Sequence, residues 1–251
     1  MAYYNIHFSP TGGTKKVACI LASALAGEYT EIDLCKDISP MTLNRQDVCL
    51  ISVPSYGGRV PAIALERLKA ITPGGAKAVL VCVYGNREWD DTLTELQDAL
   101  EDLGFVPAAA VAAVAEHSIF RQFGAGRPDG EDAAQLAAFA AGIRKKLEDG
   151  VFGPLNLAGS HGTYREFGGT PFKPEGDETC NGCGICAENC PVGAIDPENP
   201  RKTHKDKCIS CMRCTLLCPR HARDLNQLMM KGAALAMAPK LGGHKKNHLF
   251  L

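Results

Sequence analysis

The sequence predicts an α/β protein with a five-stranded parallel sheet, followed by a small α+β domain built around clustered cysteines. Three observations support this prediction. Short apolar runs alternate with helical patterns through residues 1–150, which is typical of a parallel sheet covered by helices. Glycine-rich loops follow three of the apolar runs. Eight of the 12 cysteines fall in two matching blocks near the C-terminus.

Five segments have the composition of strands. Ala76–Tyr84 is an unbroken apolar run of the kind found in strands that are covered on both faces. Val106–Glu116 is alanine-rich and has good helix propensity, but its place between two predicted helices favours a fifth strand. The other three strands are predicted at Ala2–Phe8, Tyr29–Leu34 and Asp47–Val53.

Helical periodicity separates these strands. Apolar residues recur at helical spacing in Thr14–Ala26, which predicts an amphipathic helix. The connection between the second and third strands, Cys35–Gln46, is short for a full crossover helix. Further helices are predicted near Ala62–Ala70, over Asp91–Leu103 and over Glu131–Glu148.

Composition narrows the function classes. A chain of 251 residues with 45% hydrophobic and 22% charged residues is an ordinary globular protein. Its net charge of −1 gives no reason to expect nucleic acid or a membrane as partner. The N-terminus lacks a signal-peptide pattern, and no apolar run reaches the ~18 residues of a membrane span. We therefore expect a cytoplasmic protein, in which clustered cysteines more often bind metal than form disulfides.

Each cysteine block reads C-x2-C-x2-C-x3-C-P. Three thiolates at this spacing can bind one iron–sulfur cube, while the fourth points away and binds the other. Structural zinc, the alternative, normally uses separated ligand pairs and does not fit two tandem blocks. Two [4Fe-4S] clusters are therefore predicted, one on Cys180, Cys183, Cys186 and Cys218 and the other on Cys208, Cys211, Cys214 and Cys190.

The loops after the first, third and fourth strands should meet where open α/β sheets bind ligands. The first loop, Ser9–Thr14, combines hydroxyls and glycines with a helix N-terminus, which suits a phosphate. It could equally be a glycine turn before a threonine-capped helix. Neither a Walker A pattern nor G-x-G-x-x-G is present, so nothing indicates a nicotinamide dinucleotide site.

The second and third loops, Pro54–Pro61 and Tyr84–Asp91, each carry an aromatic residue among residues suited to close backbone approach. A flat heterocycle could stack on Tyr56 or Trp89 while backbone amides bond its polar edge. Taken singly, both aromatic residues could be ordinary surface or core residues. Three unusual loops at one sheet edge favour a ligand site.

These motifs resemble two known families. Residues 1–150 resemble flavodoxins, whose phosphate loop has the form T-x-T-G-x-T; Ser9 replaces its first threonine here. Residues 180–220 resemble bacterial-type two-cluster ferredoxins, although the second block ends in an unusually polar CPRHARD. The order of parts is similar to that in a family of bacterial and archaeal chains that join both domains. The resemblance implies a sheet order of 2-1-3-4-5 and FMN as the flavin.

The resemblance also implies which residues would hold the flavin. The first loop would bind the phosphate, and the other two loops would surround the ring. The implied residues are Ser9, Thr11, Gly12, Gly13 and Thr14 for the phosphate, and Pro54, Ser55, Tyr56, Gly57, Gly58, Tyr84, Gly85, Asn86, Arg87 and Trp89 for the ring.

The remaining expectations concern organisation. Residues 1–150 would form the flavodoxin-like domain, 151–175 a packed linker, 176–225 the ferredoxin domain and 226–251 a C-terminal helix and tail. A helix over Ala222–Ala238 should turn Leu225, Leu228 and Met229 inward, with its lysine-bearing end frayed. His117 is expected to be a plain loop histidine, although it lies near the flavin edge. Small buried hydrophobic residues are expected at Cys19, Cys35, Cys49 and Cys82.

The leading hypothesis is an electron relay between the two clusters and FMN, serving a redox partner protein or a small acceptor. A second hypothesis is a flavoenzyme that reduces a particular quinone, nitro compound or free flavin. It needs acid–base groups over the ring, and the sequence offers no clear pair. A third hypothesis is a redox sensor whose clusters control partner binding. The direction of electron flow does not follow from the sequence.

Overall fold

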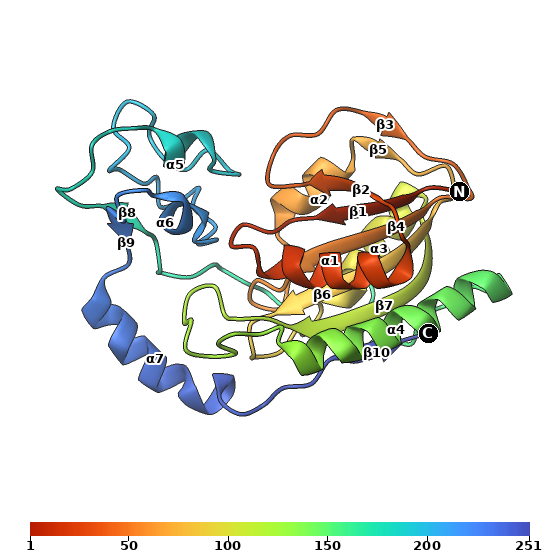
Figure 1. The fold of residues 1–251 in the computed structure, drawn as a ribbon. Helices are drawn as coiled ribbons and strands as arrows, with labels where there is room; N and C mark the ends of the chain where they lie inside the picture. Colours follow the sequence, from red (N-terminus) through yellow and green to blue (C-terminus); the bar gives the residue numbers. More distant parts are fainter.

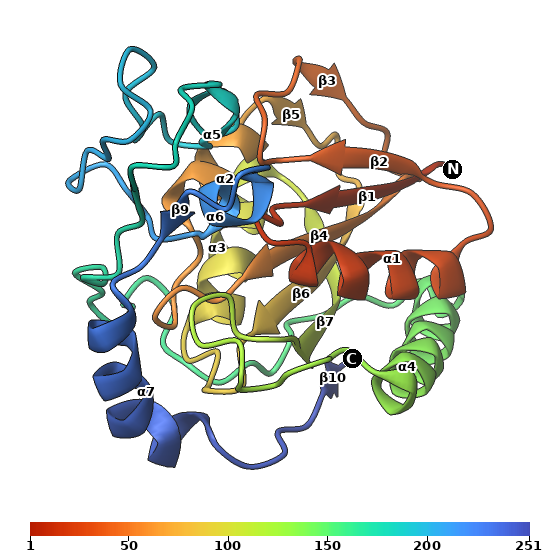
Figure 2. The same ribbon diagram turned by 60° about the vertical axis from the view of Figure 1, so that its left-hand side comes forward.

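The computed structural model describes residues 1–251, and its first 150 residues form a sheet between two layers of helices (Figures 1 and 2). Two helices cover each face of the sheet, so both faces are buried, as expected for parallel strands. One face carries α1 (Gly13–Leu25) and α4 (Gly130–Asp149), and the other carries α2 (Ala62–Leu68) and α3 (Thr92–Leu103).

The sheet contains five parallel strands in the order β2-β1-β4-β6-β7, followed by an antiparallel strand, β10, at its edge. Counted along the chain, the parallel strands stand in the order 2-1-3-4-5. The five predicted parallel strands all form, and the C-terminal tail adds a sixth, antiparallel strand, β10, which was not predicted. The strands are β1 (Tyr3–His7), β2 (Thr30–Asp33), β4 (Val48–Pro54), β6 (Lys77–Tyr84), β7 (Val106–Val114) and β10 (His248–Phe250).

The alanine-rich segment forms β7, as predicted. Residues 108–114 are fully buried between β6 on one side and β10 on the other, with helices above and below. Backbone pairing on both sides of the strand outweighs the helix propensity of its alanines. The segment between β2 and β4 forms no helix, as expected, and its two-residue strand β3 (Met41–Thr42) pairs with β5 (Ile71–Thr72).

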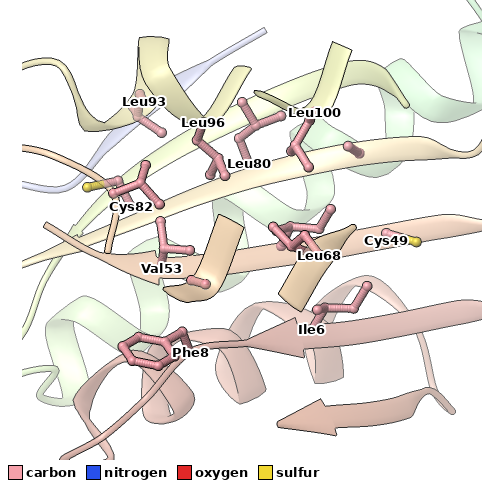
Figure 3. Close-up of a cluster of buried hydrophobic side chains, with 14 of the residues drawn as sticks. Ile6, Phe8, Cys49, Val53, Leu68, Leu80, Cys82, Leu93, Leu96 and Leu100 are labelled. Carbon is pink, nitrogen blue, oxygen red and sulfur yellow. The ribbon is translucent and has the colours of Figure 1, made fainter. Parts of the chain in front are cut away.

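Buried side chains form one core on each side of the sheet. In the core shown in Figure 3, Leu68 of α2 and Leu96 and Leu100 of α3 pack onto strand residues such as Leu80. Because these side chains are fully buried, the helices hold the sheet edge and its loops in fixed positions.

The scattered cysteines belong to the cores, with one exception. Cys35, Cys49 and Cys82 are buried as predicted, whereas Cys19 is only partly buried. Burial raises the pKa of Cys35 and of Cys49 to about 12. These thiols therefore stay protonated and act as small apolar side chains.

The cysteine-rich part lies beyond the carboxyl ends of the parallel strands (Figure 1). Before it, the linker packs against the first domain, where Leu155 is buried in the core. The cysteine-rich part has two short helices and a two-stranded antiparallel sheet that joins its beginning to its end. These elements are α5 (Ile185–Glu188), α6 (Arg213–Leu217), β8 (Glu175–Gly176) and β9 (Arg223–Asp224).

The C-terminal segment departs most from prediction. Helix α7 (Gln227–Leu241) begins five residues later than expected and leads from the cysteine-rich part back to the sheet (Figure 2). Leu225 is buried as predicted, but Leu228 and Met229 are 82% and 39% exposed. The lysine-bearing end is not frayed, because it continues into β10. No helix combines the length and the apolar composition needed to cross a bilayer.

Candidate functional site

The three glycine-rich loops meet at the carboxyl edge of the sheet and line one cavity. Eight of the fifteen residues predicted for the flavin contribute to its wall: Thr11, Gly13, Thr14, Pro54, Ser55, Tyr56, Tyr84 and Gly85. The segment that follows β7 supplies Ala115, Glu116, His117 and Ser118.

The first loop leads directly into α1. Gly12 precedes the helix with a φ of 89°, a conformation that favours glycine. The hydroxyl oxygen of Ser9 accepts a hydrogen bond from the backbone N–H of Lys15 at 2.8 Å, so Ser9 fixes the first helical turn. Because the N-cap residue is Gly12, no side chain caps the helix at that position. Thr14 is almost fully buried at the cavity wall. The helix N-terminus and the threonines suit an anion there.

The second loop turns sharply at Gly57 and Gly58, and the backbone groups of Tyr56 and Arg59 bond each other at 3.0 and 3.2 Å. Both glycines have positive φ angles, 63° and 89°. The turn is covered by the linker, since a Cβ atom on Gly57 would lie 2.1 Å from the ring of Phe167. The cavity wall includes Tyr56 but neither glycine.

In the third loop, Asn86, Arg87 and Trp89 lie outside the cavity wall, although the resemblance implied them. Arg87 forms an ion pair with Asp90 of the same loop, whereas Asn86 and Trp89 contact the C-terminal tail. The side-chain amide of Asn86 donates to the carbonyl of Gly243 at 2.9 Å. The centroids of the Trp89 and His248 rings are 5.0 Å apart. The C-terminal tail therefore holds the loop whose beginning faces the cavity.

His117 lies at the cavity, where sequence reasoning favoured a plain loop residue. Its Nδ1 atom accepts hydrogen bonds from the backbone N–H groups of Ile119 and Phe120, both at 3.1 Å. The ring proton of the neutral form must then reside on Nε2. Burial, aided by the charge of Arg87, lowers the pKa of His117 to about 4. The one available signal was its place directly after a strand at the ligand edge.

The first cysteine set surrounds a hollow in the cysteine-rich part. Its wall contains Cys180, Cys183 and Cys186 together with Cys218 of the second block, the crossed combination that the spacing predicts. These four cysteines line a hollow and do not converge on a single point. A cube binds each thiolate through a different iron, and this donor set fits that arrangement.

The second cysteine set is grouped around Cys211, which is buried. Burial raises the pKa of Cys211, and the neighbouring thiolates of Cys214, Cys190 and Cys208 raise it further, which reflects how close these four are. Backbone N–H groups already point at the sulfur atoms of both sets, as from Ala194 to Cys190 at 3.2 Å. These donors stabilise thiolates, so the second set fits a cluster as well.

The second cysteine block adjoins the cavity. Ile209 packs against the core of the first domain, and burial together with the Cys211 thiolate raises the pKa of Tyr56 well above its usual value. A further cavity shares Thr11 with the first one and is walled on its far side by Met212. The second cysteine block and the first two loops therefore lie next to each other.

Comparisons with known proteins relate the cysteine-rich part and the first 150 residues to different groups of proteins. Residues 179–223 match the family described as "4Fe-4S dicluster domain". Trichloroethene reductive dehalogenase of Dehalococcoides mccartyi is 34% identical over 87 residues, which cover 28% of this chain and 16% of that protein. The chain thus spans about one sixth of the length of this curated relative.

Two flavodoxin structures resemble the first part of the chain. A flavodoxin from the domain Archaea is 12% identical to this chain, with a TM-score of 0.42. The aligned region covers 59% of this chain and 99% of that flavodoxin. The Streptococcus pneumoniae TIGR4 flavodoxin is 17% identical, with a TM-score of 0.41, and covers 58% and 99%.

The strand order and the family match together define the class of protein. The chain joins a flavodoxin-like α/β domain to a 4Fe-4S ferredoxin-type domain. Both domains belong to the classes of fold that support electron transfer.

Proposed function

We propose that this protein is an electron-transfer flavoprotein that relays single electrons between two [4Fe-4S] clusters and a bound FMN. The clusters would supply one-electron steps, and the flavin would hold one or two electrons. The observation that supports this proposal most strongly is the cavity between the two domains, which is lined by Thr11 of the first loop and by Met212 and Thr215 of the second cysteine block. A partner protein or a small acceptor would complete the relay.

Each part of the cavity suits a different part of FMN. The hydroxyls of Thr11 and Thr14 and the N-terminus of α1 suit the phosphate. The ring of Tyr56 offers a flat apolar surface for the flavin ring, and Gly85 leaves backbone groups open to its edge.

The first test is anaerobic purification followed by absorbance and EPR spectra and by chromatography of the acid-released cofactor. We expect the spectra of reduced [4Fe-4S] clusters together with FMN. Protein that shows no flavin absorbance, and that does not bind added FMN, would contradict the flavin part of the proposal.

A second test concerns the relay itself. When a one-electron donor is mixed rapidly with the oxidised protein, cluster bleaching should be followed by reduction of the flavin. The rate of the second phase should not depend on protein concentration, because both sites are on one chain. A second phase whose rate rises in proportion to protein concentration would mean that electrons pass between molecules instead.

A flavoenzyme is the second candidate, and one observation favours it. The cavity between the domains is continuous with the three-loop cavity, since Thr11 and Glu116 line both. A small acceptor bound there would lie next to the flavin. Steady turnover of one quinone or nitro compound without any protein acceptor would favour the enzyme over the relay.

A further inference from the structure

Arg223 is an unusual residue for its position. It belongs to the polar CPRHARD segment that ends the second cysteine block, and it begins β9. Its side chain is only 2% exposed, so a positive charge is buried inside a small domain. A buried guanidinium needs compensating partners, and these partners indicate what the residue does.

Three oxygen atoms hold the two terminal nitrogens of Arg223. One of them donates to the carbonyl of Pro200, and the other donates to the carbonyl of Pro174 at 3.0 Å and to the hydroxyl of Thr203. None of these partners is a carboxylate, so no acidic side chain forms an ion pair with the guanidinium. Its Nε–H is buried and has no partner.

The two cysteine sets lie on either side of this charge. Arg223 lines the hollow of the first set, and the Pro200 carbonyl that it bonds also contacts the sulfur of Cys186 at 3.9 Å. On the other side, β9 packs against α6, which carries Cys214 of the second set. The guanidinium of Arg223 lies close enough to Cys186 and Cys214 for its charge to act on the sulfur atoms of both.

We propose that Arg223 is a shared tuning residue of the two clusters, whose buried charge and unpartnered Nε–H raise the reduction potentials of both. Each cluster becomes more negative when it gains an electron, so a fixed neighbouring cation favours the reduced form. The buried surroundings keep this interaction from being screened by water. The inference rests on the iron–sulfur part of the proposed function and is independent of flavin binding.

The test is a potentiometric titration of the holoprotein, followed by EPR, with Arg223→Gln. Gln keeps one donor group and removes the charge. We expect both clusters to become harder to reduce by at least tenfold in equilibrium constant, which is about 59 mV for a one-electron couple. Arg220→Gln is the matched control, because it removes an equal charge at an exposed residue on the same hollow. It should change either potential by much less than tenfold.

A second variant covers the case in which Arg223→Gln loses its clusters. Arg223→Lys keeps a cation, but one that can be deprotonated. Its cluster potentials should fall as the pH rises through the lysine pKa, while those of the wild type stay level over the same range. Full cluster content with unchanged potentials in Arg223→Gln, or a pH response in Arg223→Lys equal to that of the wild type, would overturn the proposal. Neither result would affect the proposed relay, which fails only if the wild type lacks clusters or flavin.

Discussion

Thr14 is the residue on which the phosphate part of the flavin site can be tested most directly. It lines the cavity in the first turn of α1 and is 5% exposed. We expect Thr14→Ala to weaken FMN binding by about 1.5–3 kcal/mol, roughly 10–100-fold, because a hydrogen bond to a charged phosphate is lost. Fluorescence titration of flavin-depleted protein measures this. Thr14→Ser keeps the hydroxyl and should bind nearly as tightly; unchanged affinity in Thr14→Ala removes Thr14 from the site.

His117 leads to a prediction about pH. Its pKa is about 4 in the folded protein, below the usual histidine value of 6.5, so the unfolded chain binds more protons between these values. The free energy of unfolding should therefore fall as the pH drops from about 6.5 towards 4. In His117→Asn, whose side chain can still accept backbone N–H bonds, that slope should decrease by up to about 1.4 kcal/mol per pH unit.

Urea unfolding at several pH values measures the slope. Part of the slope should remain in the variant because of His7, since burial lowers the pKa of that histidine too. Equal slopes in the wild type and in His117→Asn would mean that His117 is not held neutral by its surroundings.

At the scale of elements, the C-terminal strand depends on one buried side chain. The Oδ1 atom of Asn247 accepts from the backbone N–H of Val114 at 2.9 Å, and its Nδ2 donates to Asp132 and Gln135, both at 2.8 Å. Asn247→Ala leaves the backbone N–H of Val114 buried without a partner and removes one of the donors to Asp132, which should cost about 1–3 kcal/mol of stability. His244→Ala, at an exposed residue, is the control.

Denaturant unfolding and the release of C-terminal residues by carboxypeptidase report this change. The Asn247 variant should unfold at lower denaturant and lose its tail residues faster than the control. If both variants behaved like the wild type, the strand β10 would not depend on this amide.

The sequence predicts the elements well where the pattern is local. The apolar run of β6 and the periodicity of α1 depend on neighbouring residues, and both form close to the predicted bounds. The alanine-rich segment of β7 was predicted to be a strand from its place in the alternation of strands and helices. The strand β10 could not be predicted, because its three residues gain their structure from β7, more than 130 residues earlier.

The same reasoning explains the partial result for the site. Residues such as Thr14 and Tyr56 could be placed because strand ends in a parallel sheet share one edge. Asn86 and Trp89 could not, because a distant tail decides where they point. The spacing predicts that Cys218 of the second block joins the first three cysteines, and these four side chains line one hollow.

At the scale of the whole molecule, the cluster assignment has its own test. Cys183 is an exposed member of the first set, whereas Cys19 is a partly buried cysteine outside both blocks. Cys183→Ala should lose the iron and sulfide of one cluster, about half of the total, because a cube needs four ligands. Cys19→Ala should lose none. Iron and acid-labile sulfide analysis of both variants measures the loss. Full retention of iron and sulfide in Cys183→Ala would contradict the assignment of Cys183 as a cluster ligand.

The path of the chain through the cysteine-rich part limits how far the two domains can separate. The linker packs on the first domain at one end, and α7 and β10 return to its sheet at the other. A domain attached by one linker can move widely relative to its neighbour. A domain whose chain is attached to its neighbour at both ends is restrained. A protease cut within residues 151–175 should therefore leave two fragments that still migrate together. In the proposed relay, a partner protein or a small molecule would therefore have to come to this molecule, because its own domains are not free to move between partners.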